Sequence, residues 1–315
     1  MTAFIVTGCA GFIGSQLCEA LVARGDSVVG VDRFTDYYGR DLKTRNLDRL
    51  VGEERFRLVE TDVCVDGAEA LVAAAEGVFH LAAQPGVRGS WGATFEIYAR
   101  ENIVATQRVF ESAVRHGRRV VWASSSSVYG NAESYPTRED ARPRPVSPYG
   151  VTKLCCEHLA GAYRESFGLD HVGLRYFTVY GPRQRPDMAY TRIAIALRDG
   201  TPFTIYGSGE QSRDVTYVGD AVAATIAAMD SAPGGAIYNV GGGSETSLLE
   251  AIGVFETLSG RSLERRHEDV ATGDVRRTAA DTERIRSDIG WVPRTSIEEG
   301  LRAQLEWAAL VPQED

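Results

Sequence analysis

The first thirty-two residues constrain the fold of this chain more than any other stretch. A short apolar run, Phe4–Val6, leads into the segment 7–14, which reads Thr-Gly-Cys-Ala-Gly-Phe-Ile-Gly. Apolar residues then recur at helical spacing until Gly25, and a second apolar run ends on Asp32. This order predicts a strand, a glycine-rich turn, a helix and a second strand.

Each glycine of the turn has a physical role. Gly8 permits the tight bend, Gly11 lets the backbone approach a pyrophosphate, and Gly14 lets the helix lie against the strand. The helix N-terminus offers unpaired N–H groups and the positive end of its dipole to the phosphates. The turn residues, including Phe12 and Ile13, are therefore candidates for binding a dinucleotide.

Asp32 stands where a carboxylate can accept hydrogen bonds from the adenosine ribose. Its charge would repel a 2′-phosphate, so the sequence predicts NAD rather than NADP, although the neighbouring Arg33 weakens that inference. The glycine spacing is G-x-x-G-x-x-G rather than the commoner G-x-G-x-x-G. Tight-turn glycines without a ligand remain the alternative interpretation, and the strand–turn–helix–strand context favours NAD.

Composition sets the frame for the whole chain. With 315 residues we expect a nucleotide-binding domain, 1–176, and a smaller domain, 177–315, that mainly binds substrate, and the chain could cross between them more than once. The net charge of −9 argues against nucleic acid as a partner. We expect a cytoplasmic protein without membrane contact, because neither a signal sequence nor a long apolar run is present. The chain has five cysteines, and because this number is odd we expect free thiols rather than a set of disulfides, and no metal site.

Strands and helices continue to alternate after Asp32. We expect a third strand over 56–59 and a fourth over 77–83, and strands alternating with helices predict a doubly wound parallel α/β sheet of the Rossmann type. Asp62, with Val63, follows the third strand and could reach the adenine, or could equally cap a helix. Leu81, Ala82 and Ala83 are expected to pass beneath the cofactor. His80, inside the fourth strand, is expected to be a satisfied core histidine.

Four serines, Ser124–Ser127, follow the expected fifth strand at 118–123, on the ligand side of such a sheet. Tyr149 and Lys153 lie four residues apart on a later helix and so share one face. A tyrosine phenol, with a pKa of ~10, needs nearby positive charge to act as a base at neutral pH, and an ammonium plus a nicotinamide can supply it. The combination predicts that Tyr149 is a catalytic acid/base.

With these motifs the chain resembles the extended short-chain dehydrogenases/reductases, in their nucleotide-sugar epimerase and dehydratase branch. The resemblance implies that Ser125 is the catalytic serine, that Tyr149 is the acid/base and that Lys153 is its partner. It also places two residues beside NAD, Asn102 and Tyr176. Asn102 belongs to a long helix expected over 93–115. A homodimer joined by the helices near 93–115 and 148–167 is implied as well.

The sub-branch depends on the two residues after Ser125. Dehydratases of this branch carry an Asp-Glu pair there and UDP-glucuronate decarboxylases a Glu, whereas this chain has Ser126 and Ser127, which leaves no carboxylate for chemistry at C5 or C6. The segment 177–188, with Thr178 in place of the asparagine usual in UDP-glucose 4-epimerases, resembles UDP-glucuronate 4-epimerases. Arg185 is the candidate for binding the C6 carboxylate, and a solvated arginine is the alternative.

Further arginines resemble the family's diphosphate-binding residues. Arg213 and Arg276 are the candidates, with exposed, salt-bridged arginines as the alternative. The remaining substrate-binding candidates are Pro85, Gly86, Val87, Arg88, Ser125, Ser126, Ser127, Tyr149, Thr178, Arg192, Tyr206, Gln211 and Asp274.

The expected reaction is 4-epimerisation of UDP-glucuronate to UDP-galacturonate with tightly bound NAD. A UDP-glucose 4-epimerase, or one acting on both sugars, remains open. A 4,6-dehydratase or decarboxylase is disfavoured by the two serines. A protein that senses NAD without turning over a substrate is the alternative from another class. A Tyr149→Phe variant that retains its function would favour it.

Overall fold

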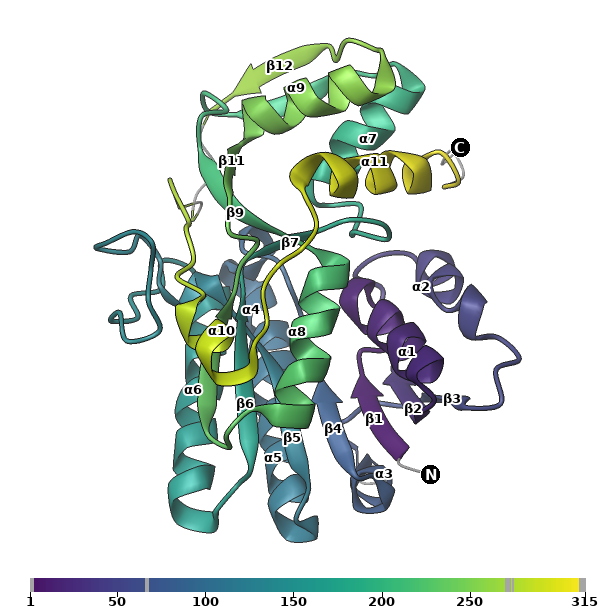
Figure 1. Cartoon of the computed structure of the whole chain (residues 1–315), viewed down its shortest axis with the longest axis vertical. Helices are drawn as coiled ribbons and strands as arrows, with labels where there is room; N and C mark the ends of the chain where they lie inside the picture. The colour runs from purple at the N-terminus through teal and green to yellow at the C-terminus, as the bar shows by residue number, and fades with distance from the viewer. Residues whose placement is uncertain (1–2, 66–67, 270–272, 274, 312–315) are drawn as a thin grey trace.

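A computed structural model describes residues 3–65, 68–269, 273 and 275–311. The protein has two lobes: a large one built on a parallel sheet, and a smaller one above the carboxyl ends of its strands (Figure 1). The expected α/β fold of the Rossmann type is confirmed.

The large sheet has seven parallel strands in the order β3-β2-β1-β4-β5-β6-β10. The chain leaves β1 in one direction and returns to β4 on its other side, which makes the β1/β4 edge the switch point where such sheets bind ligands. The strands are β1 (Ala3–Thr7), β2 (Ser27–Asp32), β3 (Phe56–Glu60), β4 (Gly77–His80), β5 (Arg119–Ser125), β6 (His171–Tyr176) and β10 (Ala236–Val240).

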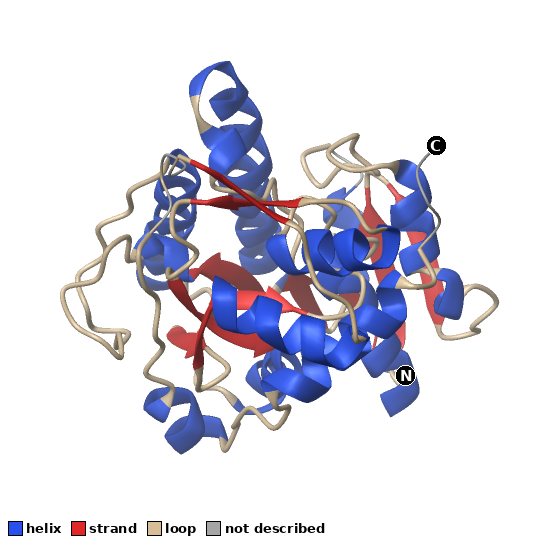
Figure 2. Cartoon of the chain, turned by 90° about the horizontal axis from the view of Figure 1, so that it is seen from above, coloured by secondary structure: helices blue, strands red, loops and turns tan. Residues whose placement is uncertain are grey.

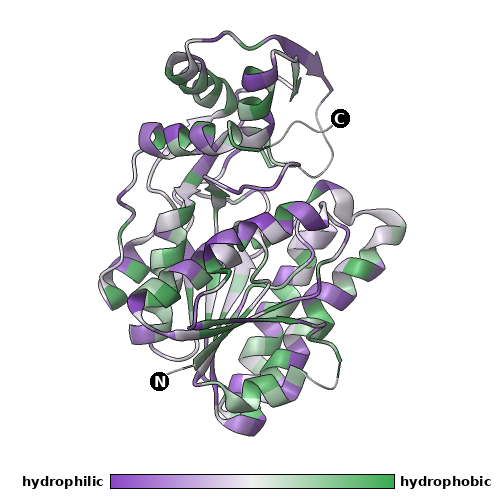
Figure 3. Cartoon of the chain, turned by 90° about the vertical axis from the view of Figure 1, so that its right-hand side faces the viewer, coloured by the Kyte–Doolittle hydropathy of each residue, from purple (hydrophilic) through white to green (hydrophobic). Residues whose placement is uncertain are grey.

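Helices cover both faces of this sheet (Figure 2). Along β1, Phe4 and Val6 join one apolar core and Ile5 joins another, as expected for a strand whose alternate residues point to opposite faces. In Figure 3 hydrophobic and hydrophilic residues alternate along the helices. This pattern is expected for the helices of the large sheet, because each packs one side on the sheet and turns the other side away from it. They are α1 (Phe12–Arg24) and α8 (Val218–Ser231) with the first core, and α3 (Ala68–Ala74), α5 (Ala105–His116) and α6 (Pro148–Phe167) with the second.

The smaller lobe has its own apolar core, which includes Ile193, Phe255 and Leu301. Because β10 and α8 return to the large lobe, the chain crosses between the lobes more than once. The lobe's strands are β7 (Thr178–Tyr180), β9 (Ser212–Tyr217) and β11 (Glu245–Ser247) in one sheet and β8 (Phe203–Tyr206) and β12 (Arg265–Glu268) in another. Its helices are α7 (Ala189–Asp199), α9 (Leu248–Ser259) and α11 (Ile297–Ala308), while α10 (Glu283–Ile289) packs on the large lobe.

The helix expected over 93–115 is interrupted. It consists of the 3-10 turn η3 (Gly92–Thr94), α4 (Phe95–Tyr98), the π-helical segment η4 (Ala99–Val104) and α5. The side chain of Asn102 in η4 bonds the backbone of Gln84 at both ends, with Oδ1 accepting at 2.7 Å and Nδ2 donating at 3.1 Å. A π-bulge at a functional position is common, and this one anchors the loop after β4.

Two other expected boundaries also differ. The fourth strand ends at His80 rather than at residue 83, and the fifth continues to Ser125. Between β2 and β3 lie the helix α2 (Arg40–Asn46) and the 3-10 turn η1 (Asp48–Leu50). Two further 3-10 turns are η2 (Arg88–Ser90) and η5 (Ser126–Val128). Among the described residues, no helix has the length and apolar character needed to span a membrane.

His80 is the buried core histidine that the sequence predicted. Its Nδ1 lies 2.8 Å from Thr7 Oγ1 and its Nε2 lies 3.1 Å from Thr106 Oγ1, so both ring nitrogens have partners. Burial, reinforced by the charge of Lys153, lowers the pKa of His80 from 6.5 to about 3. The ring therefore stays neutral in the native state at pH values where an exposed histidine is charged.

Acid is expected to destabilise the protein through this residue. Because the native pKa is depressed, the unfolded chain binds one more proton below about pH 6.5, and the free energy of unfolding falls by up to about 1.4 kcal/mol per pH unit from this residue. Urea unfolding of the wild type and of His80→Gln between about pH 7 and about pH 4 measures this slope. Equal slopes in the two proteins would contradict the assignment.

Candidate active site

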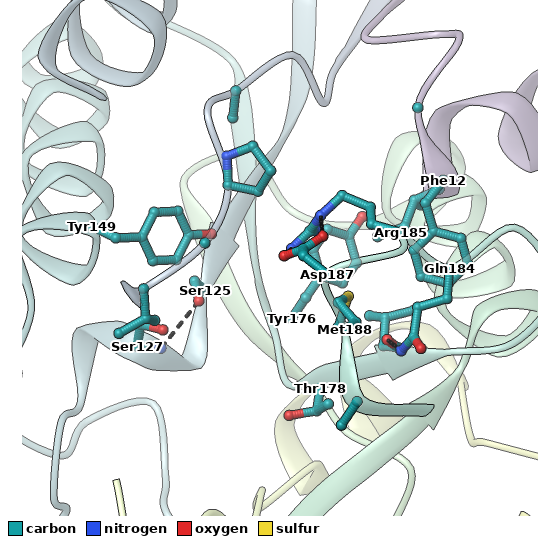
Figure 4. Close-up of a pocket in the computed structure, with 18 of the residues that line it drawn as sticks. Phe12, Ser125, Ser127, Tyr149, Tyr176, Thr178, Gln184, Arg185, Asp187 and Met188 are labelled. Carbon is teal, nitrogen blue, oxygen red and sulfur yellow. Dashed lines mark hydrogen bonds and ion pairs between the residues drawn. The ribbon is translucent and has the colours of Figure 1, made fainter. Parts of the chain in front are cut away.

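A cavity of about 710 Å³ lies where the two lobes meet, above the carboxyl ends of the β1, β4, β5 and β6 strands. The glycine turn and the end of β2 form one part of its wall, and β8 and β9 of the smaller lobe form another. Figure 4 shows Tyr149 and Ser125 on one side of this cavity and Arg185 on the other. The predicted cofactor and substrate regions are therefore parts of one continuous site.

The glycine turn leaves room for a phosphate group only because it lacks side chains. Gly8 has a φ of +73°, and a Cβ there would lie 2.8 Å from the backbone nitrogen of Ala82. A Cβ at Gly14 would lie 2.1 Å from the carbonyl oxygen of Gly8, so the close packing of α1 on the turn needs glycine. The first turn of α1 opens onto the cavity at Phe12 and Ile13. The turn thus fits the pyrophosphate of a dinucleotide.

Asp32 ends β2 and is held by three donors. Its Oδ2 accepts from Ala10 N at 3.1 Å, and its Oδ1 accepts from Phe34 N at 2.8 Å and from Lys43 Nζ at 3.1 Å. Both Asp32 and Lys43 are buried and line the cavity. The ammonium of Lys43 offsets part of the negative charge of Asp32. The sequence argument for NAD over NADP depends on that charge, so this contact weakens it.

Arg33 lies beside two carboxylates. Its Nη1 is 3.0 Å from Asp62 Oδ2 and its Nη2 is 3.0 Å from Glu101 Oε1. Burial alone would raise the pKa of Asp62, but the Cys64 N–H and the guanidinium groups of Arg100 and Arg33 outweigh it and bring that pKa to about 2. The charge of Arg33 is therefore neutralised locally, which removes the objection that Arg33 raised against NAD.

Several predicted cofactor residues lie outside the cavity wall. Among the described residues, the wall includes Leu81, Ala83 and Tyr176, but does not include Arg33, Asp62, Val63, Ala82 or Asn102. Asp62 Oδ1 accepts from Cys64 N at 2.8 Å in a local turn, and because α3 begins only at Ala68 this contact is not the helix cap of the alternative interpretation. Ala82 N donates to Thr7 Oγ1 at 3.2 Å, and Asn102 braces the Gln84 loop. Ala82 and Asn102 therefore support residues beside the cavity without lining it.

The three predicted catalytic residues are brought together at the end of β5. Ser125 Oγ accepts a hydrogen bond from Ser127 N at 3.1 Å, so its own O–H is available to donate into the cavity. Lys153 is buried, donates from Nζ to Ala123 O at 2.9 Å and lies 6.0 Å from the Tyr149 ring centroid. Tyr149 packs edge-on against Tyr98. The ammonium is therefore fixed beside the phenol, as the acid/base role requires.

Arg185 faces these groups across the cavity but is not solvated as the alternative had it. Its Nε and Nη2 bind Asp187 Oδ1 and Oδ2 at 3.0 and 3.1 Å, and Tyr37 donates to the same carboxylate at 3.3 Å. Burial opposes the charge, but Asp187 more than compensates and raises the pKa of Arg185 above its usual value. One edge of the guanidinium is therefore bound by Asp187, and Nη1 is left for a substrate anion.

Most of the remaining substrate candidates also line the cavity. The wall includes Pro85, Gly86, Val87, Arg88, Ser126, Ser127, Thr178, Arg192, Tyr206, Gln211 and Arg213. The Arg88 guanidinium lies 4.4 Å from the Tyr206 ring centroid, which connects the loop after β4 to the smaller lobe. Arg276 is not part of the wall formed by the described residues; its carbonyl accepts from Arg213 Nη1 at 3.4 Å. Asp274 falls outside the described residues.

Sequence reasoning missed Lys43, Tyr38, Gln184 and Asp187, which all line the cavity. A lysine in a short charged helix is expected to be solvated, and only the folded chain brings Lys43 to Asp32. Asp187 could have been found, because a carboxylate two residues from an arginine in a short loop often pairs with it.

The fold and this site are those of a dinucleotide-dependent enzyme. The comparisons with known proteins give its family: the chain belongs to the NAD dependent epimerase/dehydratase family, whose model matches residues 4–241. Its cofactor is accordingly NAD.

Relatives of known name match almost the whole chain. UDP-glucuronate 4-epimerase of Thermodesulfobacterium geofontis (strain OPF15) is 37% identical over 313 residues, covering 97% of this chain and 95% of the relative. An uncharacterized UDP-glucose epimerase, YtcB of Bacillus subtilis (strain 168), is 40% identical over 312 residues, covering 98% of each. The crystal structure of UDP-glucuronic acid 4-epimerase from Bacillus cereus, in complex with UDP-glucuronic acid and NAD, superposes with a TM-score of 0.95 at 39% identity and covers 98% of this chain and 99% of that one.

Proposed function

We propose that this protein is a UDP-sugar 4-epimerase that interconverts UDP-glucuronate and UDP-galacturonate. The observation that carries the choice of an acidic sugar is Arg185, a partly buried guanidinium that faces Ser125 and Tyr149 across one cavity. Ser126 and Ser127 occupy the positions where a dehydratase or decarboxylase needs a carboxylate, and both line the same cavity.

The residues around the sugar C4 account for the chemistry. NAD, when bound, would supply the acceptor for the hydride of C4 and, once reduced, the donor that gives it back. Tyr149 takes the proton of the 4-hydroxyl while Ser125 donates its O–H to the same oxygen, and Lys153 holds a positive charge beside the phenolate. The 4-keto sugar then rotates within the cavity, so that C4 is reduced again from its opposite face and its configuration inverts. Tyr149 returns the proton to O4. No net oxidation results.

A uronic acid adds a hazard, because the 4-keto group is β to its carboxylate and so favours loss of carbon dioxide. Arg185 can hold that carboxylate through Nη1, while Asp187 fixes the opposite edge of the guanidinium. Thr178, Ser126 and Ser127 provide further donors in the cavity wall. We propose that this grip keeps the C–C bond out of the geometry in which it breaks.

A UDP-glucose 4-epimerase is the second candidate. Asp187 favours it, because this carboxylate neutralises Arg185 and so lowers the attraction of the site for an anion. The named relatives include both activities.

One incubation separates the candidates. Purified protein without added NAD is given UDP-glucuronate or UDP-glucose, and the sugar is followed by proton NMR. We expect UDP-galacturonate to form from UDP-glucuronate, which requires NAD that stays bound through purification. UDP-pentose with carbon dioxide would identify a decarboxylase, and turnover of UDP-glucose alone would contradict the role given to Arg185.

We propose further that the protein is a cytoplasmic homodimer. The surface of α4, η4 and α6 exposes five apolar side chains, which fits a helix-to-helix contact between two copies: Phe95, Ile97, Val104, Val151 and Phe167. The unpaired thiols of all five cysteines fit a reducing compartment. Light scattering of Ile97→Lys against the wild type tests the dimer, because the charge should give a monomer.

A further inference from the structure

A buried ion pair lies directly behind the catalytic serine. Glu157 on α6 and Arg175 on β6 are joined by two hydrogen bonds, from Arg175 Nε to Glu157 Oε1 at 2.8 Å and from Nη2 to Oε2 at 2.7 Å. The side chains of Glu157 and Arg175 are only 6% and 5% exposed. Neither Glu157 nor Arg175 lines the cavity as the described residues form it, so the catalytic scheme above does not use them.

Each partner of this pair is attached to a segment that carries a site residue. Ser124 Oγ donates to Glu157 Oε1 at 2.6 Å, and Ser124 precedes Ser125 on β5. Arg175 Nη1 donates to Tyr129 Oη at 2.7 Å, and Tyr129 follows the turn that holds Ser126 and Ser127. Tyr129 in turn donates to Asn239 of β10 at 2.7 Å.

The same pair also fixes the catalytic helix. Tyr149, Lys153 and Glu157 are spaced four residues apart on α6, so they share one face of that helix. Lys153 bonds Ala123 O on β5, and Glu157 bonds the side chain of the next residue, Ser124. The helix that carries the acid/base is thereby bonded at two successive turns to the strand that carries the catalytic serine (Figure 1).

Stability alone does not explain such a pair. Removing two charges from water costs free energy, and replacing a buried ion pair with apolar side chains of similar size is often neutral or stabilising. What the pair provides is a fixed geometry, because a guanidinium fork accepts only one orientation of the carboxylate.

We propose that the buried Glu157–Arg175 pair is a positioning device that sets the distance between the Tyr149 hydroxyl on α6 and the Ser125 hydroxyl on β5. Both residues are positioning residues, since neither touches the substrate. The inference rests on the proposed function, because it needs Tyr149 and Ser125 to act on one sugar oxygen.

Three variants test it by steady-state kinetics with the UDP sugar that the wild type turns over. Glu157→Gln keeps the shape but turns an amide N–H₂ toward the donors of Arg175. The double variant Glu157→Leu/Arg175→Met replaces the pair with apolar volume. Ser124→Ala removes only the hydroxyl that connects Glu157 to β5, and it decides the test if either of the other two fails to fold.

We expect kcat to fall by about 10–100-fold in the first two variants and by about 3–10-fold in Ser124→Ala, with KM within about twofold of the wild type. The loss should also appear in the single-turnover reduction of the nicotinamide, read from its absorbance, while the content of bound NAD and the melting temperature of the double variant stay near wild type. A residue that served stability alone would lower the melting temperature and leave kcat unchanged.

Asp220→Asn is the matched control. Asp220 is as buried as Glu157, accepts from Thr295 N at 3.0 Å, and lies on α8 away from the cavity wall of the described residues, so kcat should be unchanged. Wild-type kcat in every folded variant would overturn the inference. A wild type that turns over neither UDP-glucuronate nor UDP-glucose would instead overturn the proposed function.

Discussion

Tyr149→Phe is expected to lower kcat by about 1000-fold or more while UDP-sugar and NAD still bind. The substitution removes only the hydroxyl that exchanges the proton of the sugar 4-hydroxyl, and general acid–base catalysis contributes about 10²–10⁴-fold to such reactions. Lys153 stays bonded to Ala123 O, and the ring can keep its edge-on contact with Tyr98, so the site should keep its shape. Turnover by proton NMR and binding by calorimetry separate the two effects.

A second tyrosine on the same helix provides the control. Tyr163 Oη donates to Glu111 Oε2 at 2.6 Å, and the residue is not part of the cavity wall formed by the described residues. Tyr163→Phe should therefore keep full turnover. If Tyr149→Phe kept it too, the hydroxyl would have no catalytic role, and a protein that binds NAD without turning over a sugar would become the better interpretation.

The fold was predictable because its signals are local. The turn glycines, the end of β2 at Asp32 and the Tyr149/Lys153 spacing each depend on fewer than about fifteen neighbouring residues, a range over which periodicity and turn chemistry are informative. The boundaries were less accurate. In the π-helical segment the side chain of Asn102 bonds Gln84, eighteen positions away, and no helical pattern contains that contact.

The parts of the site that could not be predicted are contacts between distant segments. Lys43 has the sequence context of a surface residue and becomes a buried partner of Asp32 only after α2 folds over the end of β2. Glu157 and Arg175 belong to a helix and a strand whose patterns indicate only burial and amphipathicity. Arg276, which the family resemblance places at the diphosphate, donates its backbone N–H to Asn131 Oδ1 at 3.4 Å, and its contact with the diphosphate stays a prediction.

Arg185→Ala is expected to lower kcat/KM for UDP-glucuronate by about 30–4000-fold and to leave UDP-glucose within about threefold. Truncating one partner of a buried, hydrogen-bonded charge pair costs about 2–5 kcal/mol, and only the uronic acid carries the partner charge. Asp187 would lose its own partner, but its side chain is 45% exposed and can be hydrated. Competition between the two sugars in one NMR tube measures the ratio directly.

The same variant tests how the enzyme avoids decarboxylation. Without the guanidinium, the carboxylate of the 4-keto intermediate can rotate into the plane in which the C–C bond breaks, so UDP-pentose and carbon dioxide should appear beside UDP-galacturonate. Arg183→Ala is the matched control, because Arg183 lies two residues away and pairs with Glu19 at 2.6 Å rather than facing the sugar. The role of Arg185 would be contradicted if Arg185→Ala epimerised UDP-glucuronate at the wild-type rate and released no additional carbon dioxide. This arginine would then not hold the carboxylate. The preference for an acidic sugar would have to come from Thr178, Ser126 and Ser127.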